Sequence, residues 1–239
     1  MSRTVHVPSR DAGQFSAYLA LPPAGQGPGL VLLQYIFGVN QVMRDLADHY
    51  ASLGYVVLVP DLFWRQQPDV RMADDPAQTT PQEFQSALAL EQDYDDQAGL
   101  RDLADALAYL RALPQCTGKA GALGFCLGGR LAYLMACHTD VDCAVGYYGV
   151  HLEDYLDDAK GIRAPVLMHM AGQDFLVGPE LRERIMGALA DQPLVQFQVY
   201  PQANHAFALP RGQHFHADSA ALANQRSEQF LQTHLQPGL

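Results

Sequence analysis

The sequence predicts an α/β fold, with a mainly parallel central sheet and helices on both faces. Short apolar runs alternate along the chain with longer segments of helical periodicity, which is typical of such a sheet. A glycine-rich turn at 124–129 joins one apolar run directly to a helical segment. With 239 residues, of which 49% are hydrophobic and 17% charged, the chain can form one large domain with a sizeable core.

Seven apolar segments are predicted to be strands. The first alternates apolar with polar or small residues, as in an edge strand, and the others are largely continuous apolar runs typical of buried strands. A loop rich in proline and glycine, residues 22–29, separates the first strand from the second. In chain order the predicted strands are 15–21, 30–34, 55–59, 120–123, 143–148, 165–170 and 194–200.

The helices between these strands are predicted from their caps and their apolar spacing. Asn40 is a suitable N-cap, and Gly54 ends the helix that follows it. Thr80 to Glu83 has the N-cap, the N1 proline and the glutamate of a capping box. The helical sequence after this box is expected to break near Asp93 and then to resume. The predicted helices are 40–53, 80–113 with that break, 130–137, 179–189 and 219–235.

We expect one domain over residues 1–239, because no internal repeat, low-complexity tract or linker interrupts the pattern. Residues 61–92, called the excursion below, begin with a long irregular stretch at 61–79. Ligands of parallel sheets bind beyond the carboxyl ends of the strands. We therefore interpret the excursion as a cover near the active site and not as a second domain.

Charge and targeting signals exclude several classes of protein. The formal net charge is −11 and no basic cluster occurs, so neither nucleic acid nor an anionic membrane is an expected partner. The N-terminus has no apolar core of signal-peptide length, and no apolar run has the length of a membrane span. The four cysteines form no Cys-x-x-Cys pair. These features predict a soluble protein of a reducing cytoplasm.

The turn Gly124-Phe125-Cys126-Leu127-Gly128 has the pattern of a nucleophile elbow, with cysteine as the nucleophile. A strand and a helix joined this sharply leave no room for a Cβ atom at Gly124 or Gly128. Cys126 is then forced outward at the apex, and the Leu127 amide points at the same space from the helix N-terminus. The alternative is a buried free thiol, which is the interpretation for the other three cysteines.

Two residues further along the chain can activate such a nucleophile. Asp174 follows the strand that ends near Met170, and His205 follows the strand that ends at Tyr200. The order nucleophile, acid, histidine is the order expected for this architecture. His205 would accept and return the thiol proton, and Asp174 would orient the imidazole. Taken alone, Asp174 could equally be a turn-capping aspartate, and His205 an ordinary loop histidine.

The remaining histidines and arginines are interpreted as structural. His214 and His216 have a spacing that can bind metal, but no nearby carboxylate or cysteine completes a ligand set, so we expect no metal site. His169 lies in a predicted buried strand and is interpreted as a hydrogen-bonded core residue. Three arginines are interpreted as solvated charges: Arg71, Arg101 and Arg130.

In seven segments, given at the end of this paragraph, the chain resembles the dienelactone hydrolase (carboxymethylenebutenolidase) family of α/β hydrolases. The resemblance implies an α/β-hydrolase fold, a triad of Cys126, His205 and Asp174, and an oxyanion hole formed by the Ile36 and Leu127 amides. It also implies a cytoplasmic, monomeric hydrolase of esters or lactones that needs no cofactor. The segments that carry the resemblance are 34–40, 60–62, 124–129, 144–150, 170–174, 203–207 and 219–226.

One departure from the family concerns the base. Family members carry a glutamate directly after the residue that matches Gln34, and this chain has Tyr35 there. That glutamate is understood to take the thiol proton when substrate binds. A tyrosine, with an ordinary pKa of about 10, is a poor base near neutral pH. The hypothesis is that His205 alone activates Cys126, while Tyr35 donates a hydrogen bond or shapes the pocket.

A second departure concerns the substrate. The family binds the dienelactone carboxylate with two arginines, and the position of one of them is Leu209 here. The other would fall near residues 79–90, yet no arginine occurs between Met72 and Leu100. Arg211 is at most a partial substitute. We therefore expect a substrate less anionic than dienelactone. The residues expected to line its pocket are Tyr35, Phe37, Trp64, Phe207 and Leu209.

The sequence thus predicts a hydrolase that cleaves a small ester or lactone through an acyl-cysteine intermediate, with thioesters in the same class. A protein of another class remains an alternative: a non-hydrolytic binding or thiol-sensing protein on the same fold, in which Cys126 is a redox-sensitive thiol. Tyr35 keeps this alternative open, because a cysteine without its usual partner could be a slow catalyst. An acyltransferase would need a second acceptor site.

Overall fold

Across the residues that the computed structural model describes, 2–11 and 13–236, eight strands form one sheet in the order β1-β2-β4-β3-β5-β6-β7-β8. The first two strands form an antiparallel hairpin at one edge, and β2 pairs antiparallel with β4. All pairings from β4 to β8 are parallel. The strands are β1 (Ser2–Ser9), β2 (Gly13–Ala20), β3 (Gly27–Leu33), β4 (Val56–Pro60), β5 (Cys116–Phe125), β6 (Ala144–Tyr147), β7 (Val166–Ala171) and β8 (Val195–Tyr200).

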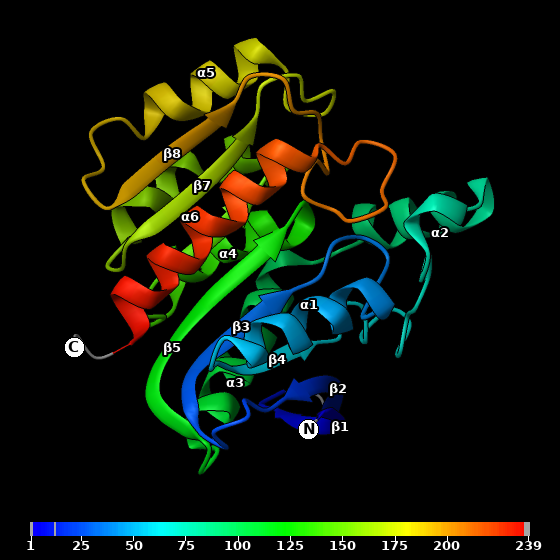
Figure 1. Cartoon of the computed structure of the whole chain (residues 1–239), viewed down its shortest axis with the longest axis vertical. Helices are drawn as coiled ribbons and strands as arrows, with labels where there is room; N and C mark the ends of the chain where they lie inside the picture. The colour runs from blue at the N-terminus through cyan, green and yellow to red at the C-terminus, as the bar shows by residue number, and fades with distance from the viewer. Residues whose placement is uncertain (1, 12, 237–239) are drawn as a thin grey trace.

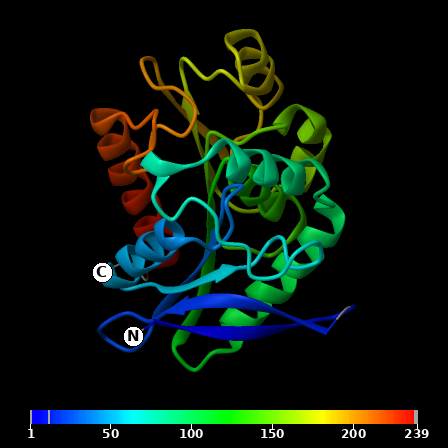
Figure 2. The ribbon, with the colours of Figure 1, turned by 90° about the vertical axis from the view of Figure 1, so that its right-hand side faces the viewer.

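Helices cover both faces of this sheet (Figures 1 and 2). Figure 2 shows α1 and α6 on one face, and α3, α4 and α5 on the other. The helix α2 lies apart from these layers, beyond the carboxyl ends of β3 and β5 (Figure 1). The helices are α1 (Gln41–Ser52), η1 (Pro76–Gln78), α2 (Pro81–Gln92), α3 (Asp96–Ala112), α4 (Leu127–His138), η2 (Leu152–Gly161), α5 (Pro179–Ala188) and α6 (Ala217–Leu235).

The predicted fold class is confirmed, and all seven predicted strands are present within a few residues of their expected bounds. The sequence analysis missed β1, whose side chains are mostly exposed, with only Val7 buried. A strand that buries so few apolar side chains lacks the clear alternation by which edge strands are recognised.

The predicted loop at 22–29 is partly wrong, because β3 already begins at Gly27. A Cβ atom at Gly27 would lie 1.9 Å from the carbonyl oxygen of Gly54. At Gly29 it would lie 2.9 Å from the side chain of Leu110. These glycines permit close backbone packing inside a strand, whereas glycine in a sequence more often signals a loop.

The predicted helix caps are confirmed. The Asn40 side chain accepts a hydrogen bond from the Met43 amide at the start of α1. Thr80 and Glu83 form both bonds of the capping box at the start of α2. The expected break near Asp93 is also present, because α2 ends at Gln92 and α3 begins at Asp96.

The carboxyl ends of the parallel strands bring the candidate site residues to one edge of the sheet. Each of these residues follows the end of a different strand, so the topology gathers positions that are far apart in the sequence. They are residues 35–37 after β3, Cys126 after β5, Tyr148 after β6, Asp174 after β7 and His205 after β8. In the described part of the chain, none of the helices is both long and apolar enough to cross a membrane.

Candidate active site

Cys126 occupies the apex of a tight turn between β5 and α4. Its backbone has φ 55° and ψ −114°, a conformation that residues other than glycine rarely adopt. The Cys126 amide donates a 3.0 Å hydrogen bond to the carbonyl oxygen of Tyr147, at the end of the neighbouring strand β6. Its side chain is half-buried. A strained residue held in this way is characteristic of a functional site.

The glycines that flank Cys126 permit this turn for the steric reason expected from the sequence. A Cβ atom at Gly124 would lie 2.0 Å from the carbonyl oxygen of Gly128. A Cβ atom at Gly128 would lie 2.4 Å from the carbonyl oxygen of Leu33 and 2.6 Å from that of Gln34. The start of α4 therefore packs directly against the turn after β3.

The resemblance implies an oxyanion hole formed by the backbone amides of Leu127 and Ile36. Leu127 is the first residue of α4, and Ile36 belongs to the turn that packs against this helix. Within the described residues, neither amide donates to another backbone group. Both amides are therefore available, as the resemblance implies for an oxyanion hole.

His205 and Asp174 form a buried pair. The imidazole Nδ1 lies 3.0 Å from Oδ2 of Asp174 and 3.2 Å from Oδ1. The Leu176 and Val177 amides donate to Oδ1 of the same carboxylate at 2.9 and 3.1 Å. Asp174 thus caps the following turn and also lies within hydrogen-bond distance of the histidine.

The surroundings of His205 favour its protonated form. Burial by itself would lower the pKa of His205. The Cys126 sulfur and the Asp174 carboxylate together outweigh that penalty and raise the pKa to about 10. Two aromatic rings pack edge-on to the imidazole, Tyr148 at 5.0 Å and Phe175 at 5.7 Å between centroids. The structure therefore brings together a cysteine, a histidine and a carboxylate.

Tyr35 is buried next to Phe37, with 5.5 Å between the ring centroids. Its hydroxyl accepts a 2.8 Å hydrogen bond from Nδ2 of Asn40. Burial raises the pKa of Tyr35 well above its usual range, and the bond from Asn40 offsets this only in part. Tyr35 is therefore a neutral phenol at neutral pH and not a base.

Of the other residues expected in the pocket, Phe207 lies next to Tyr148, whereas Trp64 does not reach the site. Phe207 is fully buried, with its ring 5.4 Å from that of Tyr148, and Leu209 is partly buried against the core. The structure does not bring Trp64 to the triad. Its Nε1 donates a 2.8 Å hydrogen bond to Asp102, and its ring stacks on Phe15 at 5.6 Å. The side-chain direction within the irregular stretch 61–79 depends on contacts that the sequence does not show.

Tyr148 was missed by the sequence analysis. It is buried with a positive φ of 39°, and its ring contacts His205 and Phe207. Burial raises the pKa of Tyr148 well above its usual range, with Cys126 contributing in the same direction. The only sequence signal was its position directly after a buried strand, where side chains reach the site edge.

Two exposed aromatic residues flank the site. Phe84 of α2 is 43% exposed, and its ring lies 6.4 Å from that of Phe37. Phe175 is 60% exposed and lies 5.4 Å from the His214 ring as well as against His205. Large exposed aromatic side chains next to Phe37 and His205 suit the binding of an apolar group.

Arg211 is already paired with an acidic residue of the excursion. Its guanidinium lies 2.5 Å from Oδ1 of Asp75. Arg211 has a positive φ of 63°. The one arginine close in sequence to His205 is thus engaged by Asp75 and not directed at a substrate.

The interpretation of Arg130 as a solvated charge is wrong. Its side chain is only 5% exposed and forms ion pairs with Glu91 at 3.2 Å and with Asp96 at 3.3 Å. Arg71 and Arg101 are exposed, as expected, and Arg101 pairs with Asp11. The sequence did not reveal the burial of Arg130, because its partners lie more than thirty residues away in the chain.

The other polar candidates are structural. Both ring nitrogens of His169 are hydrogen-bonded, to the Tyr200 hydroxyl at 2.8 Å and to the Ser227 hydroxyl at 2.9 Å. The His216 ring accepts from the Ser219 amide and caps α6. Within the described ranges, no three His, Cys, Asp or Glu side chains gather as metal ligands would.

The four cysteines are free thiols. Cys137 and Cys143 are buried, and burial raises the pKa of both thiols to about 12. Cys116 is half-buried, so the expectation of a buried thiol holds for it only in part. The high pKa values leave Cys137 and Cys143 as unreactive thiols near neutral pH.

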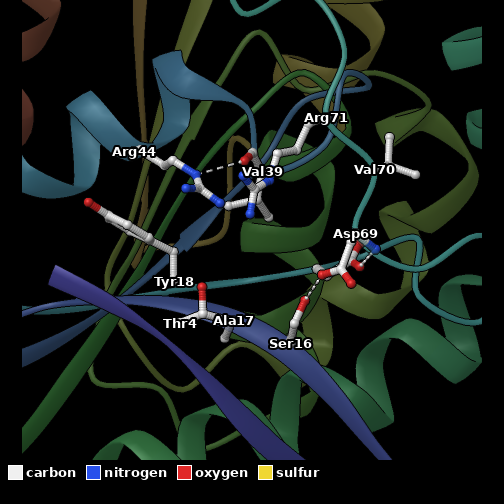
Figure 3. Close-up of a pocket in the computed structure, with 10 residues that line it drawn as sticks. Thr4, Ser16, Ala17, Tyr18, Val39, Arg44, Asp69, Val70 and Arg71 are labelled. Atoms are coloured by element: carbon white, nitrogen blue, oxygen red, sulfur yellow. Dashed lines mark hydrogen bonds between the residues drawn. The ribbon is translucent and has the colours of Figure 1, made fainter.

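A small cavity near the start of α1 lies apart from the triad (Figure 3). It holds about 10 Å³, enough for one water molecule. Arg44 and Arg71 point toward each other at its rim, and Ser16 donates to Asp69 (Figure 3). No member of the triad lines it.

The chain is similar to known proteins over nearly its whole length. The sequence profile of the dienelactone hydrolase family matches residues 15–235. A relative from Azospirillum brasilense, provisionally named carboxymethylenebutenolidase, is 42% identical over 235 residues, which cover 97% of this chain and 98% of the relative. The carboxymethylenebutenolidase of Pseudomonas putida is 38% identical over 97% of this chain and 96% of its own.

The fold is shared more widely. The crystal structure of a dienelactone hydrolase-like promiscuous phosphotriesterase from metagenomic libraries superposes with a TM-score of 0.78 at 23% identity. The match covers 98% of this chain and 99% of that one. At this level of identity the similarity shows a common α/β-hydrolase fold.

Proposed function

Since this chain belongs to the dienelactone hydrolase family of α/β hydrolases, we propose that it cleaves a small carboxylic ester or lactone with Cys126 as the nucleophile. The observation that carries the proposal is the buried pair of His205 and Asp174 beside the strained Cys126. A cysteine at an elbow, an adjacent imidazole and an orienting carboxylate are the parts that nucleophilic acyl transfer needs.

In the first half of the reaction the Cys126 sulfur attacks the substrate carbonyl carbon and forms a carbon–sulfur bond. The Ile36 and Leu127 amides stabilise the negative charge that develops on the carbonyl oxygen. When the tetrahedral intermediate collapses, the carbon–oxygen bond breaks, and the imidazolium of His205 protonates the departing alkoxide. The product is an acyl-cysteine thioester. The alcohol of an ester leaves, whereas that of a lactone stays attached to the acyl chain.

In the second half His205 accepts a proton from water, and the resulting hydroxide attacks the thioester carbonyl. The carbon–sulfur bond breaks and the carboxylic acid departs. The free Cys126 sulfur is then again next to the protonated His205, as before the reaction. Asp174 keeps the imidazole in the useful tautomer and stabilises its charged form throughout. Every bond formed or broken belongs to the substrate, water or these side chains.

The substrate is proposed to be less anionic than dienelactone. Leu209 lies where the family has an arginine, and no arginine occurs between Met72 and Leu100. Arg211 is paired with Asp75 and would have to leave that carboxylate to bind a substrate. The exposed rings of Phe84 and Phe175 instead offer apolar surface beside the nucleophile. An uncharged aryl or alkyl ester, lactone or thioester suits these surroundings.

Hydrolysis of p-nitrophenyl acetate by the wild type and by Cys126→Ala tests the proposal. We expect the variant to lose at least about 1,000-fold in kcat while keeping its thermal stability. A wild-type chain as inert as the variant would instead favour a non-hydrolytic thiol-sensing protein. Release of p-nitrophenol in a burst would indicate the acyl-cysteine directly.

A further inference from the structure

The helix α2 buries little of its surface. Of its twelve residues only Ala87 is fully buried, and Leu88 and Leu90 are partly buried against the core. Its Phe84 ring nevertheless lies 6.4 Å from Phe37, which directly follows the oxyanion residue Ile36. A helix that packs so little of its surface depends on specific polar anchors for its position.

Two anchors hold α2 to the rest of the excursion. The Glu83 carboxylate accepts from the Ala73 amide at 3.1 Å, in addition to its part in the capping box. Nε2 of Gln66 donates to the Leu90 carbonyl oxygen at 3.1 Å. Both anchors lie inside the excursion, so they do not connect α2 to the body of the protein.

The buried polar anchor that does so is Arg130, and the exposed His151 adds a longer contact, with Nε2 3.9 Å from Oε1 of Glu91. Its buried guanidinium lies 3.2 Å from Oε1 of Glu91, in the last turn of α2, and 3.3 Å from Oδ1 of Asp96, the first residue of α3. Tyr155 of η2 donates its hydroxyl to the other oxygen of Asp96. One side chain thus binds both sides of the corner at which the excursion rejoins the fold.

Arg130 also lies one helical turn after the nucleophile. Its backbone amide donates to the Cys126 carbonyl oxygen at 3.1 Å, within the first turn of α4. The same residue therefore contacts the nucleophile elbow through its backbone and the corner of the excursion through its side chain. Among the described ion pairs, His151 also reaches Glu91, but only Arg130 pairs with Asp96 as well.

We propose that Arg130 is a positioning residue that, through Glu91 and Asp96, holds α2 so that Phe84 stays beside Phe37 at the substrate site. The proposal rests on the proposed function, because it assigns Phe84 to substrate binding. Arg130 itself does not touch the reacting atoms. It determines where an aromatic wall of the site lies.

The buried pairing makes α2 sensitive to the loss of one charge. Removing one partner of a buried ion pair leaves the other charge without compensation, which disturbs the local structure more than loss of an exposed pair does. Glu91→Gln keeps the shape of the side chain and leaves Asp96 as a counterion for Arg130. We therefore expect this variant to fold and to loosen α2.

The kinetic test compares Glu91→Gln and Phe84→Ala, alone and combined, in the hydrolysis of p-nitrophenyl butyrate. We expect Glu91→Gln to raise KM about fivefold with kcat changed less than about twofold. In the Phe84→Ala background the same substitution should have no further effect on KM, since the wall it positions is gone. An equal rise in KM in both backgrounds would overturn the proposal.

Arg111→Met is the matched control. Arg111 pairs with Asp140 at 2.7 Å and with Asp142 at 2.8 Å, at the other end of α3. This variant loses an arginine with two acidic partners, yet it should leave KM within about twofold of wild type. Arg130→Lys, which keeps the charge, should raise KM less than Glu91→Gln does. A KM shift in Arg111→Met as large as in Glu91→Gln would mean that general destabilisation is the cause.

Hydrogen exchange and alkylation separate a positioning role from damage to the elbow. In Glu91→Gln, amides 84–92 should exchange at least about tenfold faster, while β5 stays protected. The rate of Cys126 alkylation by iodoacetamide should stay within about twofold of wild type. Unchanged exchange in α2, or slowed alkylation, would refute the proposal. If the wild type shows no Cys126-dependent hydrolysis, the proposed function fails, and exchange still decides whether this ion pair holds α2.

Discussion

Nδ2 of Asn40 donates a 2.8 Å hydrogen bond to the Tyr35 hydroxyl, so the N-cap of α1 also fixes the residue that replaces a glutamate of the family. The same nitrogen lies 2.9 Å from the carbonyl oxygen of Met72 and 3.1 Å from that of Ala73, so its two N–H groups are shared among three acceptors. Tyr35 is therefore held by a rigid polar group at the base of the excursion. A tyrosine held in this way suits the wall of a pocket better than it suits a base, which would have to move toward the thiol.

Tyr35→Phe should change catalysis little. The substitution removes one neutral hydrogen bond, and Tyr35 is not a base because burial raises its pKa above the working range. We expect kcat/KM for p-nitrophenyl acetate to fall less than about fivefold, with an unchanged pH profile. Steady-state kinetics between pH 5 and 9 measure this. A lost or shifted limb of the profile would show that Tyr35 takes part in proton transfer.

His205→Ala should change how the alkylation of Cys126 depends on pH. In the wild type the raised pKa of His205, about 10, keeps the imidazolium next to the sulfur through neutral pH. Alkylation by iodoacetamide should therefore vary little between pH 6 and 8. In the variant the rate at pH 7 should drop about tenfold or more and then climb with pH, as for an ordinary thiol with a pKa of about 8.5.

The matched control for that experiment is His214→Ala, which removes a partly exposed histidine that contacts Phe175 and no triad residue. Its alkylation profile should match that of the wild type. A His205→Ala profile identical to the wild type would mean that another group activates Cys126.

Leu209→Arg should shift selectivity toward anionic substrates. Leu209 is partly buried against the core four residues after His205, and an arginine there would supply a cation besides Arg211, which is paired with Asp75. We expect the ratio of kcat/KM for mono-p-nitrophenyl succinate to that for p-nitrophenyl acetate to rise about tenfold. Leu209→Met, which nearly conserves volume, should leave the ratio unchanged. A wild-type chain that already prefers the succinate would contradict the proposed substrate class.

His169→Gln should flatten the loss of stability in acid. Burial lowers the pKa of His169 to about 3, below the value of about 6.5 expected in the unfolded chain. Between these values the unfolded state binds more protons. The unfolding free energy therefore falls by about 1.4 kcal/mol per pH unit as pH drops through this window, and the penalty is absent above pH 6.5.

Urea unfolding of wild type and variant at pH 7, 6, 5 and 4 measures that contribution. Loss of the bonds to Tyr200 and Ser227 should make the variant less stable at pH 7. The difference between the two proteins should then narrow as the pH is lowered, because only the unfolded wild type is stabilised by taking up a proton at this residue. Parallel pH dependences would show that His169 does not contribute.

Features with local causes were predictable from the sequence. The elbow at Cys126 follows from two glycines whose Cβ atoms would clash with backbone, and the caps at Asn40 and Thr80 follow from side chains that bond within their own turn. The order of Cys126, Asp174 and His205 after successive strands follows from the topology of a parallel sheet. For the elbow and the caps, the residues that decide the structure lie within a few positions of one another. For the candidate triad, they follow the carboxyl ends of parallel strands, which lie at the same edge of the sheet.

By itself, then, the sequence determined the mainly parallel sheet, the elbow and the candidate triad, since apolar runs, glycines and caps act on their immediate neighbours. Only the tertiary structure decided that Trp64 turns toward Asp102, that Arg130 is buried between Glu91 and Asp96, and that Arg211 is bound by Asp75. Those side chains find their partners across long stretches of chain. Their burial and pairing depend on how the excursion packs, which no local pattern encodes.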